Sequence, residues 1–290
     1  MKLKERNITF TEDFQQVIAY LAADRSREDQ LKCIRETGNH APAWLLKAGL
    51  LKAIGIPEPK KKAENFLTFG CYVPFMSISK LRDTMKLLDL LGIDYTYSAE
   101  KEICCGAPPL EDSIISVGIP EEEKQKVKAA CKDFMQYNWD LGKQAGAKNM
   151  IYACQVCAAL VRNTFPEDAG SHRWVYDVMM DKLEEKTLEI IPTVMGYFEG
   201  CHRYFPYMGN LDWPRYRKVM GNIKGLTLVD LDNHNCCKQN PERILEEAEK
   251  KNLDSILVPC GDGHYFLKKA SKGKIEVKNL PEILIQVLGA

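Results

Sequence analysis

From residue 65 onwards the chain alternates short apolar runs with amphipathic stretches. In the first half, the apolar runs typical of strands are 66–71, 93–97 and 149–153. The stretches with helical periodicity are 80–92, which ends at a glycine, and 120–145, which opens with Pro-Glu-Glu-Glu. The first half is therefore predicted to alternate strands and helices.

The second half repeats this plan. Its predicted strands are 193–201, 226–231 and 255–260, and its predicted helices are 213–223 and 241–251. Alternation of this kind predicts a parallel α/β sheet in each half, with ligands gathering at the carboxyl ends of the strands. We expect one domain over 64–191 and a second over 192–290.

Residues 1–63 differ from the rest and are expected to form a helical extension. Helical periodicity marks 10–21, with Thr11 as its N-cap, and a second apolar run covers 43–54. Pro57 and Pro59 precede a run of lysines and are typical of a linker. The segment is interpreted as a helical extension packed on the domains, or alternatively as an arm that docks a partner protein.

Composition narrows the function classes. The 40 basic and 40 acidic residues cancel, which removes any general attraction to nucleic acid or anionic lipid. No stretch reaches the ~18 apolar residues of a membrane span, and the charged N-terminus does not resemble a signal peptide. We therefore expect a cytoplasmic protein, free or attached to the membrane through a partner. Eleven cysteines in that compartment indicate metal binding rather than disulfides.

Nine of the cysteines form two unequal copies of one pattern, each cysteine at or after a predicted strand end. The first copy is Cys71, Cys104-Cys105-Gly106 and Cys154-Gln-Val-Cys157. The second copy is Cys201, Cys236-Cys237 and Cys260-Gly-Asp-Gly263. Cys33 and Cys131 lie outside the pattern in helical segments, where we expect them to be small buried side chains.

The chemistry of this pattern favours an iron–sulfur cluster. Thiolates are soft ligands, and Cys-x-x-Cys brings two sulfurs to one site. Adjacent cysteines diverge and suit a multinuclear cluster better than a single zinc ion. Five thiolates also exceed the four that tetrahedral zinc or a cubane cluster requires. A redox dithiol and a structural zinc site remain the alternatives.

These residues resemble the cysteine-rich CCG domain family, and most closely the B-type subunits of heterodisulfide reductase, over residues 64–290. The resemblance implies two pseudo-symmetric Rossmann-like α/β domains. It also implies a noncubane 4Fe-4S cluster, whose ligands here would be Cys71, Cys104, Cys105, Cys154 and Cys157. The first three of these would form the cluster-borne catalytic centre.

The second copy departs from the family pattern. Gly263 stands at the fifth position, Lys238 follows the Cys-Cys pair, and His264 is a candidate substitute ligand. We expect Cys201, Cys236, Cys237 and Cys260 to hold a second metal site. The spacing between Cys105 and Cys154 is longer than expected, which indicates an insertion around 111–123.

The resemblance implies one component of a reductase complex, which exchanges electrons with a small thiol or disulfide. Without a ferredoxin motif or dinucleotide fingerprint in this sequence, it would take electrons from, or pass them to, a ferredoxin-like iron–sulfur protein of the C type, with an A-type flavoprotein behind it. The alternative is a relay or assembly component in a succinate-, lactate- or sulfur-oxidising complex. The residues beside the cysteines that could supply protons or hydrogen bonds are Tyr72, His202, Tyr204 and His234.

Overall fold

The computed structural model describes residues 26–39, 44–115, 118–204 and 209–289, with side chains except at 44–46, 112–115 and 201–202. The helix expected at 10–21 lies outside these ranges. The first part of the chain folds as α2 (Arg27–Thr37), α3 (Trp44–Ala53), β1 (Asn65–Thr68), α4 (Val73–Met76), α5 (Ile78–Leu90), β2 (Tyr95–Thr96), α6 (Ala107–Ile115), α7 (Glu121–Gln144), β3 (Asn149–Tyr152), α8 (Gln155–Thr164), β4 (His172–Trp174) and α9 (Val175–Leu183).

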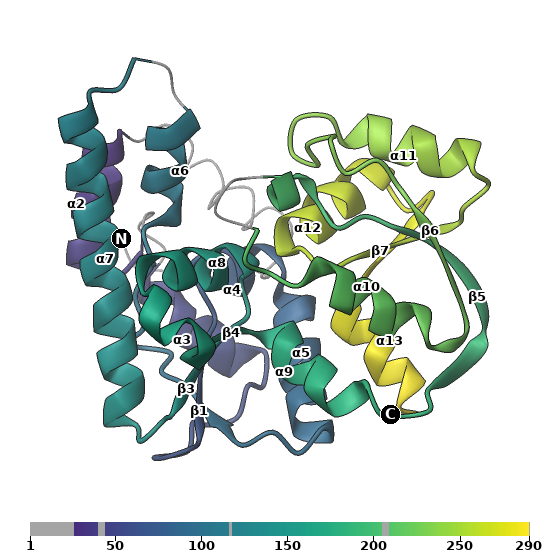
Figure 1. Ribbon diagram of the computed structural model, residues 1–290, viewed down its shortest axis with the longest axis horizontal. Helices are drawn as coiled ribbons and strands as arrows, with labels where there is room; N and C mark the ends of the chain where they lie inside the picture. The colour runs from purple at the N-terminus through teal and green to yellow at the C-terminus, as the bar shows by residue number, and fades with distance from the viewer. Residues whose placement is uncertain (1–25, 40–43, 116–117, 205–208, 290) are drawn as a thin grey trace, which may run out of the picture.

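The second part repeats the alternation (Figure 1). Its elements are β5 (Glu189–Tyr197), α10 (Trp213–Gly221), β6 (Lys224–Asp230), α11 (Pro241–Lys250), β7 (Ser255–Val258), α12 (Gly261–Ser271), β8 (Glu276–Asn279) and α13 (Leu280–Val287). All strands predicted from the sequence are present within a few residues of their expected bounds. The expected boundary at 191/192 falls inside β5, and the division into domains there stays a prediction.

The two sheets have equivalent topologies. The strand orders are β2-β1-β3-β4 and β6-β5-β7-β8, and every neighbouring pair is parallel. The α/β, Rossmann-like fold expected from the sequence is therefore confirmed, with four parallel strands in each sheet. Parallel order aligns the carboxyl ends of the central strands β1 and β3, and likewise those of β5 and β7.

The halves differ in the crossover that follows the second strand. In the first half α6 and the long helix α7 connect β2 to β3, whereas α11 alone connects β6 to β7. The long helix α7 has three acidic residues in its first turn, where they interact favourably with the helix dipole. This additional helix accounts for the long spacing between Cys105 and Cys154.

A shared core joins the two halves. Helix α13 at the end of the chain packs along α5 of the first half, and Asn279 Nδ2 donates to Asp83 Oδ2 over 2.9 Å between them. Trp174 packs edge-on against Trp213, with ring centroids 5.4 Å apart. Their indoles belong to one buried apolar cluster that includes residues of both sheets. The second half is thus packed against the first and cannot be described as an independent lobe.

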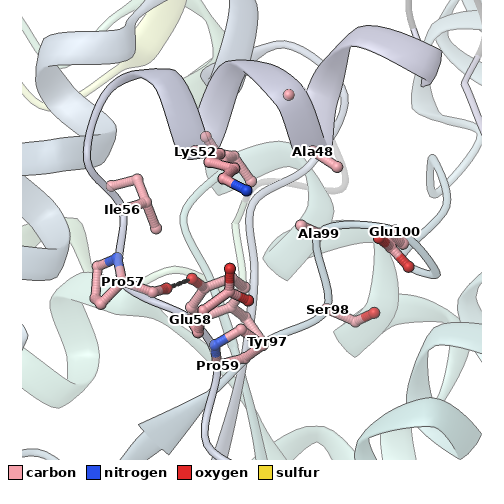
Figure 2. A pocket seen from close by; sticks show the side chains of 12 residues that line it. Ala48, Lys52, Ile56, Pro57, Glu58, Pro59, Tyr97, Ser98, Ala99 and Glu100 are labelled. Atoms are coloured by element: carbon pink, nitrogen blue, oxygen red, sulfur yellow. Dashed lines mark hydrogen bonds between the residues drawn. The ribbon is translucent and has the colours of Figure 1, made fainter.

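The N-terminal extension is part of the first half. Leu31 and Ile34 of α2 are buried in its core, and α2 contacts α6 and α7. The following linker also lies on the protein, because Tyr97 donates its hydroxyl hydrogen to the carbonyl of Pro57 (Figure 2). In the described residues 26–39 and 44–63, the segment is packed on the first half, and the interpretation of 1–63 as a whole stays a prediction. Among the helices of the described chain, none is long and apolar enough to cross a membrane.

Candidate metal centre

The five cysteines of the first set are delivered by three strand ends and meet at one edge of the sheet. Cys71 follows β1, and Cys104 and Cys105 lie in the loop after β2. Cys154 follows β3 as the N-cap of α8, and Cys157 lies in the first turn of that helix. Their convergence follows directly from the parallel order of β2, β1 and β3.

The sulfur atoms form one continuous chain of contacts. Cys105 Sγ lies 3.2 Å from Cys157 Sγ. Cys104 is hydrogen-bonded to both Cys71 and Cys105, and Cys154 is hydrogen-bonded to Cys157. Four of the five side chains are at least nine-tenths buried, and Cys154 is half-buried. The sulfur atoms therefore follow one another in the order Cys71, Cys104, Cys105, Cys157 and Cys154.

Burial and mutual hydrogen bonds shift the pKa values of the cysteine thiols in the first set. The hydrogen bond from Cys104, together with burial, raises the pKa of Cys105 well above its ordinary value. Hydrogen bonds to Cys105 and Cys154, together with burial, raise the pKa of Cys157. The hydrogen bond from Cys157 lowers the pKa of Cys154. Without a positive partner most of these buried side chains thus favour the neutral thiol, and the all-sulfur donor set suits a cluster of soft iron ions, which would stabilise the thiolates.

A buried carboxylate fixes the turn that carries Cys71. Glu102 accepts the backbone N–H groups of Phe69, at 3.1 Å, and Gly70, at 2.6 Å. Lys47 of α3 lies 2.9 Å from the same carboxylate, and both side chains are at most 3% exposed. The N-terminal extension thus contributes directly to the geometry of the site.

The Cys104-Cys105 loop is held from two further sides. Asn138 of α7 accepts the N–H of Ile103 and donates to its carbonyl, at 2.9 and 2.7 Å. The carbonyl of Gly38, just after α2, accepts the N–H of Cys104 at 2.7 Å. Lys47, Glu102 and Asn138 were not predicted from the sequence. The only signal for them was the position of Glu102, two residues before the Cys-Cys pair.

The surroundings of Gly106 leave no room for a side chain after the Cys104-Cys105 pair. Its φ is +83°, and a Cβ at this position would lie 2.5 Å from Cys131 Sγ. Cys131 is buried, and its thiol donates to the Gly106 carbonyl over 3.3 Å. Cys33 is also buried, with its sulfur 3.5 Å from the Thr37 hydroxyl. Both cysteines outside the pattern are small packed side chains in this fold.

The second set is described only in part. Cys237 and Cys260 are buried and Cys236 is half-buried, whereas the side chain of Cys201 lies outside the described part. The turn before Cys201 resembles its counterpart, because Asn233 Oδ1 accepts the Gly200 N–H at 3.2 Å. Among the described residues, those of the first set included, no group of three or more His, Cys, Asp or Glu side chains is arranged to hold a metal ion. Ligation by either set stays a prediction.

The structure shows what surrounds the missing fifth cysteine position and the candidate substitute ligand His264. A Cβ on Gly263 would lie 2.7 Å from Val258 Cγ1, so a cysteine there has no room without movement of that side chain. His264 points to the first half, where its Nδ1 lies 3.0 Å from the Ser77 hydroxyl. Burial lowers the pKa of His264 to about 4. This hydrogen bond links α12 to the start of α5.

The two halves share a cavity beside the first set. It is small, with a cavity volume of about 60 Å³, and it is open to solvent at its mouth. The residues that line it and bear on function are Cys71, Tyr72, Cys154, Gln155, Cys260 and Asp262. Gln155 is 3% exposed, and neither of its amide atoms has a hydrogen-bond partner. The first set thus opens towards the cysteine at the start of α12.

The aromatic and histidine residues beside the cysteines lie in two places. Tyr72 is at the shared cavity, where burial and then the nearby Asp262 raise its pKa. Tyr204 and His234 are exposed and stacked, with ring centroids 4.2 Å apart. His234 Nδ1 lies 2.8 Å from Asp232. The His202 side chain falls outside the described residues.

A second pocket lies away from the cysteines. It is formed by α3, the linker and the segment after β2, and Lys52, Glu58 and Glu100 are among its lining residues (Figure 2). None of the lining residues is a cysteine or histidine. This pocket has no soft ligands, and the shared cavity is the better candidate for redox chemistry.

A comparison with known protein families matches the part of the chain that carries the first cysteine set. Residues 67–162 match the family "CCG: Cysteine-rich domain", and this segment contains all five cysteines of the first set. The family resemblance drawn from the cysteine pattern is therefore confirmed for this segment. The second half lies outside the matched residues.

Two curated proteins share low but extended similarity with the chain. One is the D subunit of the dihydromethanophenazine:CoB–CoM heterodisulfide reductase of Methanosarcina acetivorans, 26% identical over 81% of this chain and 62% of that protein. The other is lactate utilization protein A of an Exiguobacterium species, 28% identical over 60% of this chain and 73% of that protein. The chain thus spans less than two thirds of the heterodisulfide reductase relative.

Solved structures add little. Glutamate racemase RacE1 of Bacillus anthracis aligns over 78% of this chain and 82% of its own, with 13% identity and a TM-score of 0.35. A likeness of that size carries no functional argument. The sequence similarity and the cysteine geometry are the findings on which a function can be based.

Proposed function

We propose that this chain is the iron–sulfur subunit of a heterodisulfide-reductase-like oxidoreductase. The proposed ligands of a noncubane 4Fe-4S cluster are Cys71, Cys104, Cys105, Cys154 and Cys157. The observation that carries the proposal is the continuous chain of buried sulfur contacts, in which Cys105 and Cys157 lie 3.2 Å apart. The similarity to the D subunit of a heterodisulfide reductase supports the reaction class.

The residues present fit such a cofactor. The donor set is entirely sulfur, buried, and one thiolate larger than a cubane needs. When bound, the cluster would supply one-electron transfer to a sulfur atom of a thiol–disulfide couple. The protein's own part is to hold the sulfurs: Glu102 and Lys47 fix the turn at Cys71, and burial excludes water from the ligands.

The substrate would enter by the shared cavity. Cys71 and Cys154 line it from the first half and Cys260 from the second, so a small disulfide there would reach the proposed cluster ligands. Cys201, Cys236, Cys237 and Cys260 are proposed to hold a second site with one ligand fewer. The close approach of Val258 to Gly263 supports the smaller ligand set.

Electrons would come from partner proteins. The proposed partners are a ferredoxin-like iron–sulfur protein of the C type and a flavoprotein of the A type, in a cytoplasmic complex. The naming of the heterodisulfide reductase relatives as lettered subunits supports a complex. The formal charge of zero agrees with protein and small-molecule partners in preference to nucleic acid.

The test is anaerobic reconstitution of the full chain with iron and sulfide. We expect a brown protein with about four irons and acid-labile sulfide in the first site, and reduction of small disulfides once the partner proteins are added. Cys105→Ala is expected to lose the iron of the first site and the activity, and Cys33→Ala, at a buried cysteine outside the set, to retain both. A colourless protein that takes up only zinc would support the structural alternative.

A second candidate is an electron-relay component of another oxidoreductase. The similarity to lactate utilization protein A and the missing fifth cysteine of the second set favour it. Under this alternative the reconstituted complex would accept electrons but would not reduce any small disulfide. The same preparations therefore distinguish the two functions.

A further inference from the structure

Lys80 of α5 is a buried positive charge at the junction of the two halves. Its side chain is 1% exposed, and its Nζ donates to the carbonyl of Pro259 over 2.8 Å. Nζ also lies 5.7 Å from the centre of the Tyr176 ring. Within the described ranges Lys80 forms no ion pair with a carboxylate. Burying an ammonium group is unfavourable unless its surroundings supply negative charge.

Acidic side chains from both halves of the molecule lie near Lys80. Burial lowers the pKa of Lys80, and the nearby Cys260, Cys154 and Asp262 oppose that change. A Cβ on Gly261, the first residue of α12, would lie 3.9 Å from Lys80 Nζ. The ammonium group is therefore next to the start of this helix. Cys154, Cys260, Gly261 and Asp262 all line the shared cavity. The charge therefore lies where the two sets approach each other.

The carbonyl that Lys80 binds is held by a second donor from the first half. The Tyr176 hydroxyl donates to the same Pro259 oxygen over 3.1 Å. Pro259 directly precedes Cys260, so both donors fix the turn that carries this cysteine into the cavity. Lys80 and Tyr176 share this positioning role, but only Lys80 brings a full charge.

We infer that Lys80 tunes the redox potential of the proposed cluster, because its ammonium stabilises the negative charge that the sulfur ligands gain on reduction. This inference rests on the proposed function. A fixed cation in a site of low dielectric favours the more negative, reduced state and therefore raises the potential. The effect of Lys80 on the site is thus distinct from ligation and from the positioning of the Cys71 turn by Glu102.

The experiment compares Lys80→Met with Tyr176→Phe in the reconstituted full chain. Each variant removes one hydrogen bond to the Pro259 carbonyl, and only the first removes a charge. Iron and sulfide are counted, and the midpoint potential is then measured by dithionite titration, in which the cluster gains one electron. Lys80→Met is expected to lower the reduction equilibrium constant about tenfold, which is about 59 mV for one electron. Tyr176→Phe is expected to shift it much less.

Equal shifts of the midpoint potential in the two variants would show that Lys80 acts only as a hydrogen-bond donor, and would overturn the inference. An unchanged midpoint potential in Lys80→Met would overturn it as well. If Lys80→Met fails to retain iron, Lys80→Gln, which keeps a donor without the charge, is judged by the same criterion. A wild-type chain that binds no iron would instead refute the proposed function. Iron-loaded wild-type protein with an unshifted variant refutes this inference alone.

Discussion

The ammonium of Lys47 lies 2.9 Å from the carboxylate of Glu102, and both side chains are almost completely buried. This ion pair joins helix α3, before the first strand, to the loop that carries Cys104 and Cys105. Through its two backbone hydrogen bonds, Glu102 also holds the turn before Cys71. An ion pair that includes no cysteine therefore connects three of the five proposed ligands.

Breaking this pair on one side should be costly. Lys47→Met leaves the Glu102 carboxylate buried without its partner, and we expect the free energy of unfolding of the apoprotein to fall by about 3–5 kcal/mol. Lys52→Met, at an exposed position on the same helix, should change it by no more than about 0.5 kcal/mol. Urea denaturation measures both. A loss in Lys47→Met no larger than in the control would show that the pair does not stabilise the fold.

The glycine after the Cys-Cys pair allows a similar test. Gly106→Ala places a Cβ 2.5 Å from Cys131 Sγ and holds an alanine at positive φ, so we expect a loss of about 2–4 kcal/mol in stability. The clash, but not the backbone strain, should be relieved in the double variant with Cys131→Ala. A double-mutant cycle should give a coupling energy of about 1 kcal/mol or more. Strict additivity would contradict the proposed clash.

The sequence predicts those parts of the structure that depend on the local pattern of apolar and polar residues. The apolar runs of the central strands and the cysteines at their ends predicted both sheets and the edge at which the first set meets. Lys47 could not be found in this way, because its partner Glu102 is distant in sequence and their contact depends on how α3 packs. Strand β8 was missed because four residues with two charges carry no apolar run. Its strand identity comes from pairing with β7.

The second set was harder for a different reason. The sequence shows four cysteines and suggests His264 as a replacement ligand, but the hydrogen bond to Ser77 directs that ring to the first half. Similarly, only packing reveals that Cys260 lines a cavity with Cys71 and Cys154. Relations between the two halves are set by tertiary contacts such as α5 with α13, which leave no periodic signal in the sequence.

Restoring the fifth cysteine should not by itself complete the second site. In Gly263→Cys the new Cβ would lie 2.7 Å from Val258 Cγ1, so we expect a loss of about 1–3 kcal/mol in stability and no additional iron on reconstitution. Adding Val258→Ala removes the obstructing methyl groups and should restore part of the stability. Iron analysis of the single and double variants decides the matter. Extra iron in Gly263→Cys alone would show that Val258 moves aside readily.

A substitution at Gln155 should affect the stability of the apoprotein and the binding of a substrate differently. Its two amide atoms are buried and unpaired, so Gln155→Met should leave the stability of the apoprotein unchanged or raise it by up to about 1 kcal/mol. If these atoms bind a substrate in the shared cavity, the same variant should raise the KM for the disulfide. Thermal unfolding and steady-state kinetics give the two values. A destabilised apoprotein with an unchanged KM would show that the amide has a structural partner instead.

His172 predicts a specific dependence of stability on pH. Its ring is fully buried beside Trp139 and lies 2.8 Å from the Tyr152 hydroxyl, and burial lowers its pKa to about 4. The unfolded chain therefore takes up a proton below about pH 6.5, which the folded chain does not until about pH 4. The stabilising effect of the neutral ring is complete above about pH 6.5 and is lost as the pH falls towards about 4.

The loss attributable to His172 should be on the order of 3 kcal/mol over that interval. His172→Gln, which cannot titrate, is expected to be less stable than wild type at about pH 7.5 because ring contacts are lost, and the gap should narrow as the pH is lowered to about 5. Urea denaturation of both apoproteins at matched pH isolates this one group, because all other titrations are common to them. Parallel stability curves would mean that the histidine is protonated in the folded protein as readily as in the unfolded chain.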